Sequence, residues 1–195
     1  MIHGLAAKMA SVFVLYGESS EEDKDIYTYA CEAIISTLAN ILAVLIIALI
    51  LGRIVDSLIF ITIFAFLRKF TGGHHANSHF KCILTLSIIV LSSLILSDLL
   101  VNMQMVFFSL LFLAVISSVG IFICAPVGHD NKPVEAIKLE DLKKKGRRFT
   151  LLFAIICILV GYIVNLRSGL VIAFAMLFVL ISLIYATLSR KFLDS

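Results

Sequence analysis

Long uncharged apolar runs alternate with short polar segments along this chain. A helix rises about 1.5 Å per residue and the hydrocarbon core of a bilayer is about 30 Å thick, so a run of roughly 20 apolar residues can cross it. Five runs are long enough to be spans if Asp98 lies at an interface: 33–52, 82–101, 105–124, 149–166 and 168–189. The run 54–67 is shorter and contains Asp56, so we expect it to be tilted, broken or packed where the bilayer thins. The pattern predicts about six transmembrane helices in a single integral membrane domain, 1–195.

The first 30 residues have a different pattern. Their apolar positions follow helical spacing at Ile2, Leu5, Met9, Val12 and Tyr16. An acidic stretch follows where a cleavable signal would have small residues. We therefore expect residues 1–30 to be a cytoplasmic segment with an amphipathic helix lying on the membrane surface, rather than a signal peptide.

The composition narrows the class of protein further. Hydrophobic residues make up 61% and charged residues 15% of the chain, with a mean hydropathy of +1.10. An ordinary soluble domain has about 45–50% apolar and about 25% charged residues. This excess of apolar surface excludes a soluble globular protein, a disordered chain and a disulfide scaffold. The fold class predicted is an all-α polytopic membrane protein.

The distribution of basic residues predicts the sidedness. Fourteen Lys and Arg residues fall in the N-terminal segment, the 68–81 loop, the 132–148 loop and the C-terminus, whereas the opposite loops hold only Arg53 and Arg167. Basic residues are retained on the cytoplasmic side of membrane proteins. We therefore expect both termini and these two loops to be cytoplasmic.

The segment from Arg68 to Cys82 is the richest in reactive side chains. Gly72 and Gly73 break the helix and permit a bend, and Asn77 or Ser78 can cap the next one. Cys82 then lies in the first turn, where the helix N-terminus and Lys81 favour its thiolate.

A histidine near this cysteine would complete a nucleophile–base pair. On one straight helix His75 would lie about 10.5 Å from Cys82, too far for proton transfer. His75 must therefore lie on the turn before the helix and fold back, while His79 is the nearer rival on spacing alone.

Other interpretations of these residues remain open. His74, His75 and His79 are also explained as interfacial residues of a polar loop. His75, His79 and Cys82 would share one helical face, so a metal site is possible with His129 or a carboxylate as a fourth ligand. We expect neither a metal nor a cofactor. Cys31, Cys124 and Cys157 are expected to be packing residues.

A basic cluster precedes the fifth long run. It comprises Lys143, Lys144, Lys145, Arg147 and Arg148. Such a cluster can anchor anionic lipid head groups, dock an acidic peptide, or do both. A small transporter or peptide exporter is an alternative function, for which Asn40, Asp56, Asp98 and Asn165 would be the intramembrane polar residues.

Together these motifs resemble the AgrB family of bacterial membrane endopeptidases. The resemblance is carried by Arg68-x-x-x-Gly72-Gly73-x-His75-Ala76, by Cys82 seven residues after His75, and by Ala125-Pro126 followed by Asn131-Lys132-Pro133. The segment ending Tyr27-Thr-Tyr-Ala-Cys-Glu32 also fits, and the match covers most of the chain. Cys124 stands where many relatives have His, and we assign it no role.

The resemblance implies a quorum-sensing maturation protease in the bacterial cell membrane. Such an enzyme cleaves an AgrD-like precursor peptide on the cytoplasmic face, through a thioester that resolves into a cyclic thiolactone or lactone. Cys82 would be the nucleophile and His75 the base. The substrate-binding candidates are Arg68, Lys69, Gly72, Gly73 and the basic cluster. The partners expected are the precursor and anionic lipid, with a homodimer as a candidate assembly and no nucleic acid.

Overall fold

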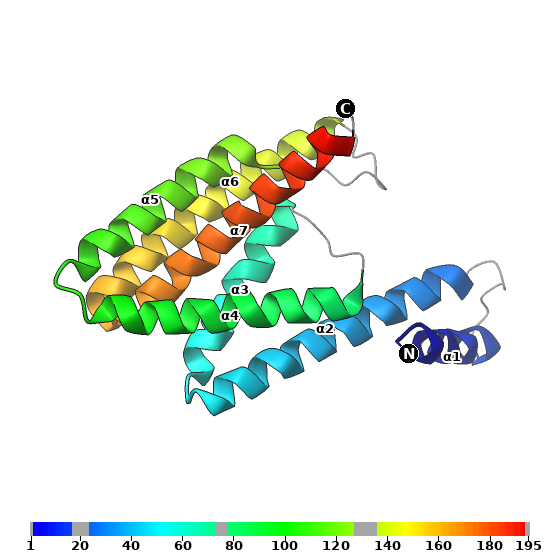
Figure 1. Ribbon diagram of the computed structural model, residues 1–195. Helices are drawn as coiled ribbons and strands as arrows, with labels where there is room; N and C mark the ends of the chain where they lie inside the picture. Colours follow the sequence, from blue (N-terminus) through cyan, green and yellow to red (C-terminus); the bar gives the residue numbers. More distant parts are fainter. Residues whose placement is uncertain (1, 17–23, 73–77, 127–135, 194–195) are drawn as a thin grey trace. The chain divides into compact units, whose positions relative to one another are not determined.

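The computed structural model describes residues 2–16, 24–72, 78–126 and 136–193, and the regular elements in these ranges are helices. Figure 1 shows them in chain order. They are α1 (Ile2–Tyr16), α2 (Lys24–Ile50), α3 (Ile54–Thr71), α4 (His79–Val101), α5 (Val106–Cys124), α6 (Ala136–Leu159) and α7 (Leu166–Leu193), with a π-helical turn at Val160–Val164 between α6 and α7. The predicted all-α class is confirmed.

Five of these helices are long and apolar enough to cross a membrane: α2, α4, α5, α6 and α7. The protein is therefore polytopic. Helix α3 has 18 residues, longer than the run 54–67 that we expected there. It is about 27 Å long at 1.5 Å per residue, but it carries Asp56 in its first turn and Arg68 and Lys69 in its last. A crossing by α3 stays a prediction.

Two helices begin well before their apolar runs. Helix α2 starts at Lys24, within a few residues of the start near Glu21 that the Ser20-x-x-Asp23 capping pattern predicts from the sequence. Helix α6 starts at Ala136 rather than near residue 149. The segment that we expected as a 132–148 loop is thus helical from Ala136 onward. Ion pairs at i,i+4 spacing, Glu140–Lys144 and Asp141–Lys145, stabilise this polar part of α6. These helical turns are charged, so the pattern of uncharged residues in the sequence does not reveal them.

The chain forms two compact units. The N-terminal unit comprises Met1–Ile47 and Ala76–Ser87, and the main unit comprises Ala48–His75 and Ile88–Ser195.

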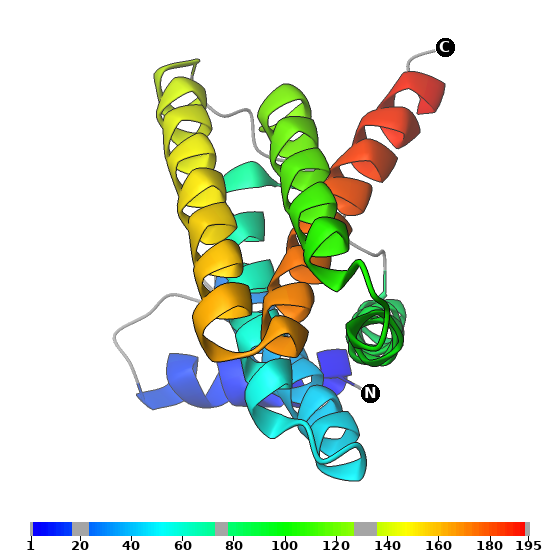
Figure 2. The ribbon, with the colours of Figure 1, turned by 90° about the vertical axis from the view of Figure 1, so that its left-hand side faces the viewer.

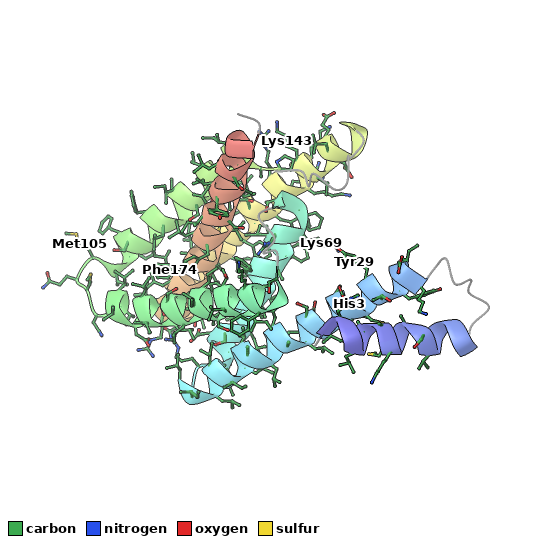
Figure 3. The ribbon with its side chains drawn as sticks, turned by 45° about the vertical axis from the view of Figure 1, so that its right-hand side comes forward. His3, Tyr29, Lys69, Met105, Lys143 and Phe174 are labelled. Carbon is green, nitrogen blue, oxygen red and sulfur yellow. The ribbon has the colours of Figure 1, made fainter. Side chains whose placement is uncertain are left out.

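In the N-terminal unit, α1 is the helix that the spacing at residues 2–16 predicts. It buries the small residues Ala6 and Ala10 and leaves Leu5, Met9 and Val12 exposed. Nδ1 of His3 in α1 lies 2.5 Å from Oε1 of Glu32 in α2; His3 and Tyr29 are labelled in Figure 3. The exposed apolar residues suit a membrane surface, and that location stays a prediction.

In the main unit, α7 is the central helix. Its apolar span is 67% buried, against 17–22% for the other four candidate spans. It packs against α3, α5 and α6, and α5, α6 and α7 run side by side (Figures 1 and 2). Residues 169–176 of α7 are all buried, among them Phe174, labelled in Figure 3. A helix that is apolar on all faces is stable only when other helices or lipid surround it.

Two glycines allow the α6–α7 connection to close tightly. A Cβ placed on Gly169 at the start of α7 would lie 2.6 Å from the Cα of Gly161 in the π-helical turn. Real side chains never approach backbone so closely, so the two segments can touch only because both residues lack a Cβ. This contact joins the start of α7 to the π-helical turn that follows α6.

Candidate functional site

Cys82 lies in the first turn of α4, as the sequence predicts. The helix begins at His79, and the backbone N–H of Cys82 donates to the carbonyl oxygen of Ser78 at 3.0 Å. Ser78 thus precedes the helix at the position expected for a cap. The four cysteines form no disulfide; Cys82 and Cys124 are half-buried, while Cys31 and Cys157 are buried.

The two buried cysteines, Cys31 and Cys157, are packed within the protein. Sγ of Cys157 donates to the carbonyl oxygen of Gly169 at 3.2 Å, joining α6 to α7. Cys31 is 6% exposed. The contact of Cys157 and the burial of Cys31 fit the expectation that these thiols are packing residues.

A polar side chain of α2 contacts the Cys82 thiol. The side-chain amide nitrogen of Asn40 lies 3.7 Å from Sγ of Cys82, within hydrogen-bonding range for sulfur, and both residues belong to the N-terminal unit. The Asn40 carbonyl oxygen Oδ1 is buried and accepts no hydrogen bond from the part of the chain that the structure describes. Sequence reasoning counted Asn40 only among possible transporter residues. The two positions are 42 residues apart, so no local motif connects them.

Most of the histidines lie outside the residues that the structure describes. Gly73, His74, His75 and His129 are not among the described residues, and of His79 only the backbone is described. The Cys–His pair and the alternative metal site therefore both stay predictions. Within the described ranges, no three His, Cys, Asp or Glu side chains come together as metal ligands.

The end of α3 in the main unit has the predicted helix break. Gly72 has a φ of 77°, a left-handed conformation that favours glycine, and its N–H donates to Arg68 O at 3.0 Å. The Arg68 guanidinium lies 5.6 Å from the Phe64 ring centroid, and Lys69 Nζ lies 5.8 Å from that of Phe70. Both cations thus extend along aromatic rings of their own helix.

The basic cluster lies on α6, where its members differ in their contacts. Lys144 and Lys145 form ion pairs with Glu140 and Asp141 at 2.9 and 2.8 Å. A hydrogen bond from Lys144 and its charge lower the pKa of Glu140.

The remaining members of the cluster have different surroundings. The Arg147 guanidinium lies 5.5 Å from the Phe122 ring centroid and donates to Phe122 O at 3.4 Å. Lys143 and Arg148 are exposed and make no ion pair with the described residues within 4.0 Å. The charges of these two side chains are therefore not neutralised by an ion pair within the described residues.

The structure brings the basic cluster and the end of α3 together. A Cβ on Gly146 of α6 would lie 3.6 Å from the backbone oxygen of Phe70, so the two helices approach closely here. Phe70 stacks on Phe149 of α6 with ring centroids 4.9 Å apart. Beside this contact is a groove of about 430 Å³, lined by Phe70, Lys145, Arg148, Phe149 and Leu152. Figure 3 labels Lys69 and Lys143 on the two helices. The groove offers apolar rings and cations in one place.

Three of the four polar residues named for a transporter, Asp56, Asp98 and Asn165, lie in the main unit and have polar partners there. Asp56 and Asp98 each accept from Arg53, at 2.7 and 2.6 Å. Oδ1 of Asn165 accepts from the backbone N–H of Arg167 at 2.9 Å.

The fold and these residues define a polytopic helical membrane protein with a cysteine in the first turn of one helix and a basic cluster in the first half of another. The sequence model described as accessory gene regulator B (AgrB) matches residues 6–183. The chain belongs to this family, whose members take part in quorum sensing, as the resemblance implied.

Two relatives from Clostridium perfringens are similar over the same length. An AgrB-like protein 2 of strain 13 / Type A and an AgrB-like protein of strain SM101 / Type A are each 32% identical over 129 residues. The aligned part is 64% of this chain and 60% of each relative, so the chain spans less than two thirds of their length. No solved structure is significantly similar to the chain.

Proposed function

We propose that the protein is a membrane cysteine endopeptidase that cleaves an AgrD-type precursor peptide and closes its product into a thiolactone or lactone ring. The observation that carries this proposal is Cys82, half-buried in the first turn of α4 and seven residues after His75 in a member of the AgrB family.

The reaction proposed has two acyl transfers. His75 takes the Cys82 thiol proton as the sulfur attacks the scissile carbonyl and forms a C–S bond. The C–N bond then breaks, and the leaving amine receives the proton from His75. A thioester joins the precursor to Cys82. A Cys or Ser side chain within the precursor attacks this thioester, which closes the ring and releases the Cys82 thiol. No metal or cofactor is required.

Exclusion of water favours the ring over hydrolysis of the thioester. The contact of Cys82 with Asn40 supports such an environment. Asn40 is the eighth residue of the apolar run 33–52, about 10 Å along the helix from its start. A thiol that contacts it is close to apolar segments of the chain.

The basic side chains suit a substrate with an acidic tail. Lys143, Lys144, Lys145, Arg147 and Arg148 lie on α6, and the groove beside Phe70 adds apolar surface. Arg68 and Lys69 lie in the last turn of α3 and Gly72 caps it; Gly73 and His75 follow in the sequence. The excess of basic residues in these segments favours a cytoplasmic site, where a newly made precursor is found. The same cations also attract anionic lipid.

Covalent capture tests the proposal. The protein is co-expressed with an AgrD-type precursor, and its intact mass is measured after acid quenching. We expect the mass of the precursor's N-terminal part to add to Cys82, and Cys82→Ala to abolish both the adduct and cleavage while inserting normally. Ala at Cys31, Cys124 or Cys157 serves as the control and should leave cleavage largely intact. Cleavage that survives in Cys82→Ala would overturn the nucleophile assignment.

A further inference from the structure

The contact between Asn40 and Cys82 has a consequence for catalysis, if Cys82 is the nucleophile of the proposed function. We infer that Asn40 is a second catalytic residue, whose side-chain amide donates to the sulfur of Cys82 and then to the oxyanion of the tetrahedral intermediate.

The position of Asn40 is not explained by stability. An amide in the apolar run 33–52 disfavours membrane insertion, and its buried Oδ1 accepts no hydrogen bond from the described residues. An apolar residue of the same size would avoid both costs. A polar residue kept under these conditions is accounted for by a role in chemistry.

The geometry suits an oxyanion donor. A carbonyl carbon attacked by Sγ carries its oxygen two bonds from the sulfur, and a donor must lie about 2.7–3.1 Å from that oxygen. An amide nitrogen 3.7 Å from Sγ can meet this condition when the oxygen lies on the α2 side of Cys82. The amide is neutral and keeps its protons, so the balance of the reaction is unchanged.

The electron movements show where the donor acts. As the C–S bond forms, the π electrons of the carbonyl move onto oxygen, and the hydrogen bond from Asn40 stabilises this negative charge. When the C–N bond breaks, the electrons return and the thioester carbonyl forms. The donor is therefore used most strongly in the transition states, and it lowers the barrier without tightening substrate binding.

Asn40→Leu removes the donor and nearly preserves the shape. With an AgrD-type precursor that the wild-type protein cleaves, we expect kcat to fall about 10²–10³-fold, the usual cost of one lost oxyanion donor, and KM to change little. Asn40→Gln keeps the carboxamide and should recover part of kcat. Ser36→Ala is the matched control, because Ser36 is a buried polar residue one turn earlier on α2. Equal losses of kcat in Asn40→Leu and Ser36→Ala would overturn the role of Asn40 as an oxyanion donor.

A second measurement does not depend on the precursor. In a protein that retains only Cys82, with Ala at the other three cysteines, the rate of alkylation by iodoacetamide at neutral pH reports thiolate availability. We expect Asn40→Leu to slow it, because the thiolate loses a hydrogen bond. An unchanged rate would refute the contact. If Asn40→Leu does not accumulate in membranes, the alkylation rate of Cys82 is measured in Asn40→Ala instead, with the same expected decrease.

Comparing Cys82→Ala with Asn40→Leu distinguishes failure of this inference from failure of the proposed function. Cleavage that survives in Cys82→Ala rejects the cysteine mechanism, and with it the catalytic role of Asn40. Cleavage that requires Cys82 but is unaffected in Asn40→Leu rejects only the role of Asn40.

Discussion

Arg53 and Asp98 are 45 positions apart, yet Nη1 of Arg53 lies 2.6 Å from Oδ1 of Asp98. Nε of the same guanidinium donates to Asp56 at 2.7 Å, and the hydroxyl of Ser168 donates to the other oxygen of Asp56 at 2.7 Å. Arg53 thereby joins the start of α3 to the last turns of α4, and Asp56 extends the connection to α7.

This network predicts that Arg53→Leu strongly destabilises the main unit. The Arg53 side chain is 9% exposed and Asp56 is 13% exposed, and removing one partner of a buried ion pair costs about 3–5 kcal/mol. The free energy of unfolding in detergent micelles measures the effect. Arg167→Leu is the control, since Arg167 also pairs with Asp98 but is 42% exposed; an exposed pair contributes about 0.2–1 kcal/mol. Equal losses in the two variants would contradict a buried connection.

Gly169→Ala should also destabilise the protein, because its methyl group meets the backbone of Gly161 rather than a movable side chain. Overpacking of this kind costs about 1–3 kcal/mol. Thermal unfolding of the purified protein measures it. Gly4→Ala in α1 is the opposite case, since nothing lies within 4 Å of the added Cβ, and alanine favours a helix interior by about 0.5–1 kcal/mol. A Gly169→Ala protein as stable as wild type would refute the close approach.

A scan of three histidines tests the proposed base. We expect His75→Ala to reduce the rate of precursor cleavage by about 10²–10⁴-fold, the contribution of general acid–base catalysis, and His74→Ala or His79→Ala to reduce it far less. Cleavage is measured by mass spectrometry under single-turnover conditions.

The same three variants distinguish the cysteine mechanism from the alternative metal site. Equal losses at His75 and His79 would favour a metal site, as would loss of activity on addition of a chelator. A cysteine mechanism should instead survive the chelator and be blocked by thiol alkylation.

Neutralising the basic cluster to Gln should weaken binding of the acidic precursor about ten-fold or more at low salt, if each exposed contact contributes about 0.2–1 kcal/mol. The loss should shrink at high salt, because exposed charges are screened over about 8–10 Å. Precursor Kd in nanodiscs at two salt concentrations measures it, and labelling of a single cysteine in segment 132–148 verifies the topology.

Pairs within the cluster sharpen this test. Lys143→Gln with Arg148→Gln should weaken binding more than Lys144→Gln with Lys145→Gln, because Glu140 and Asp141 already engage the latter two. A correctly inserted five-fold variant that binds the precursor as tightly as wild type would reject docking and leave the cluster as a lipid anchor.

The class of the protein and the position of its cysteine follow from local sequence. Runs of apolar residues must be helical in a bilayer, where each backbone polar group needs an internal partner, and so 33–52 or 168–189 could be recognised without any tertiary contact. Gly72 likewise ends α3, and Ser78 precedes α4, for reasons that lie within a few residues of each. The polar turns of α6 were missed because a helical segment held by ion pairs contains no run of apolar residues.

The partners of each side chain depend on tertiary structure. Nothing near Asn40 in the sequence indicates Cys82, and nothing near Arg53 indicates Asp98, because side-chain hydrogen bonds form between helices whose packing depends on many distant residues at once. The central position of α7 is also a tertiary result, since its apolar run resembles those of its neighbours and only packing distinguishes a helix surrounded by protein from one facing lipid. The sequence alone determined the helical membrane class, the family and the cysteine at the helix start, whereas only the folded chain decided which polar group contacts that cysteine.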